Sequence, residues 1–295
     1  MLKAGKNDYV QVHKQAGTNE ERGATMKRSV VSKEYQKLQK DIVGLQKEWK
    51  KSIDPESIIP KLDKAAMDAG VPAAALAAID FDISLYLKWI DELAALIIQY
   101  QPEMEQKLSS LNGLLDEPTA IRWIDEAFSL NLLYFSNFAD EHGLDEWIPQ
   151  FLAENTLRSY LQLTAEKMQD KIKGSAPGAG CPVCGEPARL AQVEGEGKKV
   201  VHCPRCHAHW PEKKLKCSHC GNDDHEQIQF LTVEGDASAQ ILCCEKCKGY
   251  TKIIDTRQFI TKPSSDILDL TTIYLDYIAQ ENGYKAVAED LDAKN

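Results

Sequence analysis

Apolar residues recur at helical spacing through most of the first 172 residues of the chain. The repeat is clearest from Phe81 to Tyr100, where bulky residues return every three to four positions and predict an amphipathic helix. The run Asp116-Glu117-Pro118-Thr119 has the acidic residues and the proline that are typical of a first helical turn. We expect that helix to end at Gly143 and a last long helix to span Asp145 to Lys171. The pattern predicts an α-helical bundle.

The pattern changes after residue 180, where short β-prone segments flank glycine-containing turns. These segments predict two hairpins, one of Pro187–Leu190 with Lys199–His202 and one of Gln227–Val233 with Gln240–Cys244, turning through Glu194–Gly197 and at Gly235-Asp236. Helical spacing returns from Asp266 to Gln280, with Ser264 or Ser265 as a candidate cap.

The predicted fold class is therefore α+β and multidomain. An N-terminal all-α helical bundle precedes two tandem zinc-ribbon or rubredoxin-like β-hairpin modules and a short C-terminal helix. A Gly/Pro/Ser-rich stretch marks the boundary as a linker. The expected divisions are a flexible N-terminal tail (1–28), the α-helical domain (29–173), the linker (174–180), a first ribbon (181–212), a second ribbon (213–262), the C-terminal helix (263–284) and a tail (285–295).

Charge and composition exclude several classes of protein. The formal net charge of −10 argues against a general nucleic-acid binder, which needs a basic surface, and the charges between Cys181 and Ile260 nearly cancel. No apolar run is long enough to span a bilayer, and the opening stretch lacks the features of a secretory signal. We therefore expect a cytoplasmic protein that neither binds nucleic acid nor inserts into a membrane. In the reducing cytoplasm, paired cysteines are more often metal ligands than disulfides.

All nine cysteines follow residue 180, and eight of them form four Cys-x-x-Cys pairs. Each such turn brings two thiolates to one side of a tight loop, and two turns complete a tetrahedral sulfur site. The first and second pairs are separated by 18 residues and the third and fourth by 23, and both intervals suit a hairpin. The 10 residues between the second and third pairs suit a connector. The predicted metal ligands are Cys181, Cys184, Cys203 and Cys206 in one site and Cys217, Cys220, Cys244 and Cys247 in the other. The metal is iron or zinc, because both accept tetrahedral sulfur.

Catalytic groups are not apparent in the sequence, and we expect no enzyme. Four thiolates leave no open position for water on the metal, and the nucleophile-elbow, zinc-protease, P-loop and dinucleotide-binding motifs are missing. A thioredoxin-like dithiol would open a helix in a βαβ unit, which this region does not suggest. Cys243 is left over as a spare thiol, an alternative ligand or a reactive group. Five histidines in the region are surplus to the two sites: His202, His207, His209, His219 and His225.

The cysteine region resembles the formate dehydrogenase accessory protein family (FdhE). The resemblance is carried by CPVCGEPA, HCPRCHAHWPEKKLKCSHCG, CEKCKGYTKIIDTR and DILDLTTIYLDYIAQENGY, and it is strongest from Cys181 to about Tyr284. It implies a cytoplasmic accessory protein, or chaperone, that matures a molybdenum- or tungsten-dependent formate dehydrogenase, binds its catalytic subunit and carries rubredoxin-type iron. It also implies metal ligation by the eight paired cysteines.

Other functions stay open at this point. An isolated rubredoxin-type electron carrier would hardly need the large helical half, and a thiol-redox protein would need an acidic, exposed thiol. For contact with a client, residues near Trp210, Tyr250 and Lys252 are candidates, although packing within the hairpins is an equally good interpretation of them.

Overall fold

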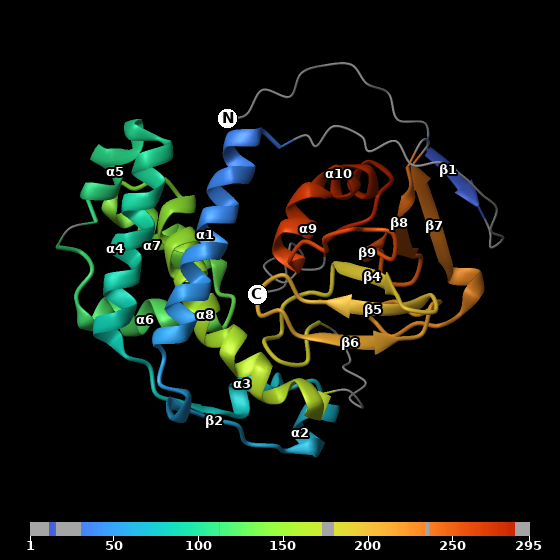
Figure 1. The fold of residues 1–295 in the computed structure, drawn as a ribbon, viewed down its shortest axis with the longest axis horizontal. Helices are drawn as coiled ribbons and strands as arrows, with labels where there is room; N and C mark the ends of the chain where they lie inside the picture. The colour runs from blue at the N-terminus through green and yellow to red at the C-terminus, as the bar shows by residue number, and fades with distance from the viewer. Residues whose placement is uncertain (1–11, 16–30, 112, 173–179, 234–235, 287–295) are drawn as a thin grey trace.

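A computed structural model describes residues 12–15, 31–111, 113–172, 180–233 and 236–286 (Figure 1). Helices from the N-terminal part gather on one side of the molecule, and a β-sheet forms the other side (Figure 1). The predicted α+β class is confirmed. None of the helices in the described ranges combines the length and the apolar character needed to cross a bilayer.

The helical part is built around α8 (Trp147–Ile172), which packs against α1, α4, α6 and α7. Those four helices span Lys33–Ser52 (α1), Ile83–Tyr100 (α4), Glu117–Phe128 (α6) and Leu132–His142 (α7). Shorter pieces are α2 (Lys64–Asp68), α3 (Ala73–Leu76), α5 (Glu105–Ser109) and the 3-10 turns Pro55–Ser57 and Pro102–Met104. The side chains of Asp82 and Asp116 accept hydrogen bonds from the first turns of α4 and α6, so these helices begin where their capping residues predict.

The helix predicted to run to Gly143 is two helices. Leu130 adopts a left-handed backbone with φ of 58°, and Asn131 then caps α7 by accepting a hydrogen bond from the Tyr134 N–H. Gly143 ends α7 as predicted, with φ of 64°. A short two-stranded sheet, β2 (Ile58–Ile59) with β3 (Ala78–Ile79), also interrupts the region expected to be helical throughout.

Within the described residues, seven strands form one continuous sheet in the order β1-β7-β8-β9-β4-β5-β6. The first predicted hairpin is β4 (Leu190–Glu194) with β5 (Lys198–His202), and the second is β7 (Ile228–Val233) with β8 (Asp236–Cys244). Parallel pairing of β4 with β9 (Tyr250–Asp255) joins the two hairpins. The edges are β6 (His209–Glu212) and β1 (Val12–Gln15), which lies in the segment expected to be a flexible tail. The two ribbons therefore share one sheet.

Helices α9 (Ser265–Thr271) and α10 (Ile273–Glu281) lie between α1 and the sheet (Figure 1). The sequence predicts one helix here, and the structure breaks it at Thr272. Leu268 and Leu275 pack with Ile241 and Ile254 of the sheet in a second hydrophobic core. The first core runs from the helical bundle directly into the cysteine region. The domain boundaries themselves stay predictions. Most of the expected linker and of the expected C-terminal tail lies outside the described residues, which omit 173–179 and 287–295.

Candidate metal centres

The four Cys-x-x-Cys turns have the same backbone geometry. In the first turn, the Cys181 N–H donates to Glu186 O at 2.7 Å and the Gly185 N–H donates to Cys181 O at 2.9 Å. The turns that begin at Cys203, Cys217 and Cys244 repeat both hydrogen bonds, with lengths between 2.8 and 3.0 Å. The residue after the second cysteine is left-handed in every turn: Gly185 (φ 79°), His207 (φ 63°), Gly221 (φ 74°) and Lys248 (φ 59°). Glycine suits this conformation because it has no Cβ.

The first cluster consists of Cys181, Cys184, Cys203 and Cys206, all of them buried. Their sulfurs lie within 4.8 Å of one another, and the Cys181–Cys206 and Cys184–Cys203 sulfur pairs are 3.5 Å apart. A tetrahedral ion with metal–sulfur bonds of about 2.3 Å requires sulfurs about 3.8 Å apart. The cluster therefore has a spacing that could hold one metal ion.

The second cluster consists of Cys217, Cys220, Cys244 and Cys247. Its Cys217–Cys247 and Cys220–Cys244 sulfur pairs are each 3.7 Å apart, close to the tetrahedral value. Cys217 and Cys244 are buried, but Cys220 is exposed and Cys247 is partly exposed. The structure thus groups the cysteines as predicted, first pair with second and third with fourth, and places only the second cluster at the surface.

The electrostatics of the clusters suit a bound cation. Although burial raises the pKa of the Cys184 thiol, hydrogen bonds with the other three cysteines and the charge of Arg205 hold that pKa well below its ordinary value. Burial, together with neighbouring thiols, raises the pKa values of Cys203 and Cys206 well above that value. Cys203 and Cys206 therefore do not ionise readily by themselves. A divalent ion would provide the compensating charge that four thiolates need.

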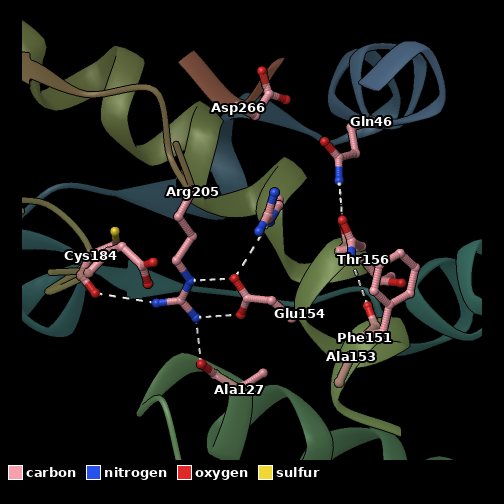
Figure 2. Close-up of polar contacts among 12 residues, drawn as sticks. Gln46, Ala127, Phe151, Ala153, Glu154, Thr156, Cys184, Arg205 and Asp266 are labelled. Atoms are coloured by element: carbon pink, nitrogen blue, oxygen red, sulfur yellow. Dashed lines mark hydrogen bonds and ion pairs between the residues drawn. The ribbon is translucent and has the colours of Figure 1, made fainter. Parts of the chain in front are cut away.

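Arg205, the residue just before Cys206, ties the first cluster to the helical bundle (Figure 2). Its buried guanidinium forms a two-pronged ion pair with Glu154 of α8, with Nε–Oε1 at 2.8 Å and Nη2–Oε2 at 2.9 Å. The guanidinium also donates to the backbone carbonyls of Cys184 and Ala127. Sequence reasoning missed this residue. The available signal was an arginine inside a predicted metal-binding turn.

Two further backbone contacts hold the first cluster in place. The N–H groups of Ala73 and Ala74, at the start of α3, donate to the carbonyls of Pro182 and Val183 at 2.9 Å. The Ser265 hydroxyl at the start of α9 donates to Cys203 O at 3.1 Å. The first cluster is therefore enclosed by the bundle, the sheet and the C-terminal helices.

The five histidines lie outside both sulfur clusters. Buried His219 places Nε2 2.6 Å from the Tyr250 carbonyl, beside the second cluster. His202 pairs with Glu194 at 3.1 Å and stacks on His209 of the neighbouring strand. These contacts agree with the interpretation of the histidines as surplus to the two sites.

The expectation that Trp210, Tyr250 and Lys252 present a contact surface is wrong. All three are at most 2% exposed. The Lys252 ammonium lies 2.7 Å from carboxylate oxygens of both Asp269 and Asp276, and the Tyr250 hydroxyl donates to Asp276 at 2.8 Å. Tyr250 and Lys252 thus fasten α9 and α10 to the sheet, whereas Trp210 packs in the first hydrophobic core. Cys243 is also fully buried, in the core beneath those helices.

Taken together, the fold and the clusters define a class of protein: a helical bundle joined to a single sheet that presents two four-cysteine centres capable of holding metal. Comparisons with known proteins narrow this class. The family model described as "FdhE, C-terminal domain" matches residues 215–291. The chain is similar to proteins of the FdhE family.

Relatives from several bacteria match along much of the chain. A protein named as an FdhE homolog from Aquifex aeolicus (strain VF5) is 28% identical over 242 residues, which cover 79% of this chain and 76% of the relative. A second FdhE homolog, from Shewanella baltica (strain OS223), is 32% identical over 67% of this chain and 64% of the relative. The crystal structure of the FdhE protein from Pseudomonas aeruginosa matches with a TM-score of 0.51, covering 85% of this chain and 86% of that one. At 20% identity, that match shows a shared fold.

Proposed function

We propose that this protein is a cytoplasmic accessory protein for a molybdenum- or tungsten-dependent formate dehydrogenase. In this proposal it acts as a chaperone that binds the catalytic subunit of the enzyme during maturation or activation. The observation that carries the proposal is similarity to FdhE proteins that extends from the cysteine region into the helical half.

We propose further that the eight paired cysteines bind two metal ions, iron or zinc, one in each cluster. Sulfur spacings of 3.5 to 3.7 Å support this assignment. When bound, each ion would supply the charge and the cross-links that order its two cysteine turns. Because four thiolates fill a tetrahedral site, the ions leave no position for a substrate, which supports a role in binding and not in catalysis.

The test is loss and recovery of formate dehydrogenase activity in the source organism. We expect deletion of the gene to lower that activity while the catalytic subunit is still made, and the tagged wild-type protein to restore activity and co-purify with the subunit. The variant Cys206→Ser, which breaks the buried cluster, should fail to restore activity. Full formate dehydrogenase activity in the deletion strain would refute the proposal.

A second candidate, a rubredoxin-type electron carrier, is favoured by one observation. The exposed Cys220 brings the second cluster to the surface, where electrons could pass to a partner. Elemental analysis and the visible spectrum of protein purified without oxygen would separate the candidates. About two iron ions per chain and a red ferric colour on oxidation would support a redox role, whereas about two colourless zinc ions would exclude it.

A further inference from the structure

A buried lysine connects the sheet to the second cluster. Lys199 lies on β5, the strand that leads into the first cluster, and it is 3% exposed. Its ammonium lies 2.7 Å from Glu212 Oε2, 2.8 Å from the Lys216 carbonyl oxygen and 3.3 Å from Ser218 Oγ. An ammonium has three donors, so each of them has an acceptor here. Lys216 and Ser218 are the two neighbours of Cys217 in the chain, so Lys199 holds the polypeptide on both sides of that cysteine.

Glu212, at the end of β6, completes this arrangement. The Ser218 hydroxyl donates to Glu212 Oε2 at 2.6 Å, while its oxygen accepts from Lys199. The Lys216 ammonium lies 3.7 Å from the other carboxylate oxygen of Glu212. The side chains of Lys199 and Glu212 are 2% and 5% exposed, so each charge is compensated by the other with almost no contact with water. Lys199, Glu212 and Ser218 therefore form one connected set of hydrogen bonds, which we call the lysine network.

Stability alone does not account for a buried pair of charges at this place. Lysine and glutamate are almost never fully buried unless they are paired, and apolar residues of similar volume are often at least as stabilising as a buried ion pair. A fully satisfied polar network, in contrast, fixes the positions of the atoms that it joins. The atoms fixed here are the carbonyl oxygen before Cys217 and the hydroxyl after it.

The Cys217–Cys220 turn needs such an anchor because it lies between strands. Residues 213–224, all of them described, form neither helix nor strand. His219 attaches the turn to the Tyr250 carbonyl of β9, and the lysine network attaches it to β5 and β6. The opposite turn, Cys244–Cys247, is continuous with β8 and leads into β9. The second cluster thus combines one turn that the strands hold directly with one turn that side chains hold in place.

We propose that Lys199 is a positioning residue for the second cluster, which with Glu212 holds Cys217 where the four sulfurs can share one ion. The inference rests on the proposed binding of metal by this cluster. Lys199 and Glu212 belong to the first expected ribbon, whereas Cys217 belongs to the second. The ribbon that carries one metal site therefore orders a ligand of the other site.

The test measures how fast an excess of chelator removes zinc from the full chain. Cys220→Ser, which lacks a complete second cluster, identifies the phase of release that belongs to the first. We expect Lys199→Met to speed release from the second cluster about tenfold or more, because loss of groups that orient metal ligands weakens metal binding about 10–100-fold. Release from the first cluster should keep its wild-type rate. Lys198→Met, at the exposed neighbouring position of β5, is the matched control and should change neither rate.

A double variant separates positioning from the cost of a stranded charge. Lys199→Met leaves the Glu212 carboxylate buried without its partner, which by itself destabilises its surroundings. Lys199→Met combined with Glu212→Gln strands no charge but still lacks the donors to Lys216 O and Ser218 Oγ, so we expect release from the second cluster to stay fast. Wild-type release from the double variant, or equal acceleration of both phases in Lys199→Met, would overturn the proposal, because lost stability alone explains either result.

Ser218→Ala is a milder change that keeps the ion pair. It removes one acceptor of the ammonium and should speed release from the second cluster about three- to tenfold. This variant also tests the network if Lys199→Met does not fold, and release at the wild-type rate would then refute the role of Lys199. If the wild-type chain loads two ions and both variants release them at wild-type rates, Lys199 has no positioning role and the proposed metal binding stands. If the wild-type chain takes up no metal, the proposed metal sites fail, and this inference fails with them.

Discussion

Replacing Arg205 with methionine tests whether the first cluster is held against the helical bundle by a buried ion pair. The substitution keeps an unbranched side chain of similar length but removes the charge and every hydrogen-bond donor. Glu154 loses both hydrogen bonds from the guanidinium, and the backbone carbonyls of Cys184 and Ala127 each lose a hydrogen-bond donor. Removing one member of a buried ion pair costs about 3–5 kcal/mol, because the remaining charge is uncompensated.

The surroundings of Glu154 place the expected cost at the lower end of that range. Its side chain is 19% exposed, and Arg158 Nε lies 3.6 Å away, so the stranded carboxylate retains water and one cation. We therefore expect Arg205→Met to lower the free energy of unfolding by about 3 kcal/mol. Glu154→Leu should cost more, because it strands a guanidinium that is 1% exposed. The double variant should cost less than the sum of the two.

The assay is urea unfolding of metal-loaded protein without oxygen, followed by far-ultraviolet circular dichroism. Metal content is measured in parallel, so that a change in stability is not confused with loss of an ion. Arg257→Met removes an arginine from an exposed pair with Asp255 and should leave the unfolding curve unchanged. A cost below about 1 kcal/mol for Arg205→Met, or additive costs in the double variant, would refute the reasoning.

Three further outcomes are expected. A chelator should remove metal in two phases, and the fast phase should come from the second cluster, because Cys220 is exposed while all four cysteines of the first cluster are buried. The variant Cys220→Ser should abolish the fast phase. A single phase of metal loss from the wild-type protein would contradict the prediction. Gly180→Ala should lower stability by about 1–3 kcal/mol, because the new Cβ would lie 2.7 Å from Gly185 O at a φ of +83°. Gly44→Ala in α1, with nothing within 4 Å of the new Cβ, should instead raise stability by about 0.5–1 kcal/mol, and urea unfolding measures both variants. Burial lowers the pKa of His202 to about 4 despite the opposing charge of Glu194. Because the unfolded chain takes up this proton near pH ~6.5, the stability of the folded protein should fall as the pH drops from about 6.5 toward 4. The variant His202→Gln should therefore show a smaller decrease in melting temperature over that interval than the wild type.

Helix positions were predictable from sequence where a local signal marks them. Asp116 and Gly143 act within one turn of their own residues, as cap and terminator. The break at Leu130 was missed because leucine rarely adopts a left-handed backbone and the apolar pattern continues through it. Asn131, which caps α7 by accepting a hydrogen bond from the Tyr134 N–H, was the local signal that the apolar pattern outweighed.

The clusters were predictable because their ligands are paired along the chain, whereas their surroundings were not. The hairpins were visible from glycine turns, but the parallel pairing of β4 with β9 joins residues about 60 positions apart and leaves no local trace. Trp210 and Tyr250 have types common at interfaces, Lys252 has a type common at the surface, and only the packed structure shows all three buried. Lysine is a misleading guide here because its burial depends on two aspartates supplied by two later helices.

Two clusters with nearly the same sulfur geometry have different surroundings, and this difference separates their roles. The first is buried, and its turns carry the carbonyls that α3 and α9 bind, so loss of its metal would loosen contacts with the bundle and with the C-terminal helices. The second leaves Cys220 at the surface and bonds mainly within the sheet. A cluster that holds the bundle and the C-terminal helices together needs a permanently held ion, whereas an exposed cluster can exchange its ion or its electrons without disturbing those contacts. The fold should therefore survive metal loss from the second cluster and lose stability with loss from the first.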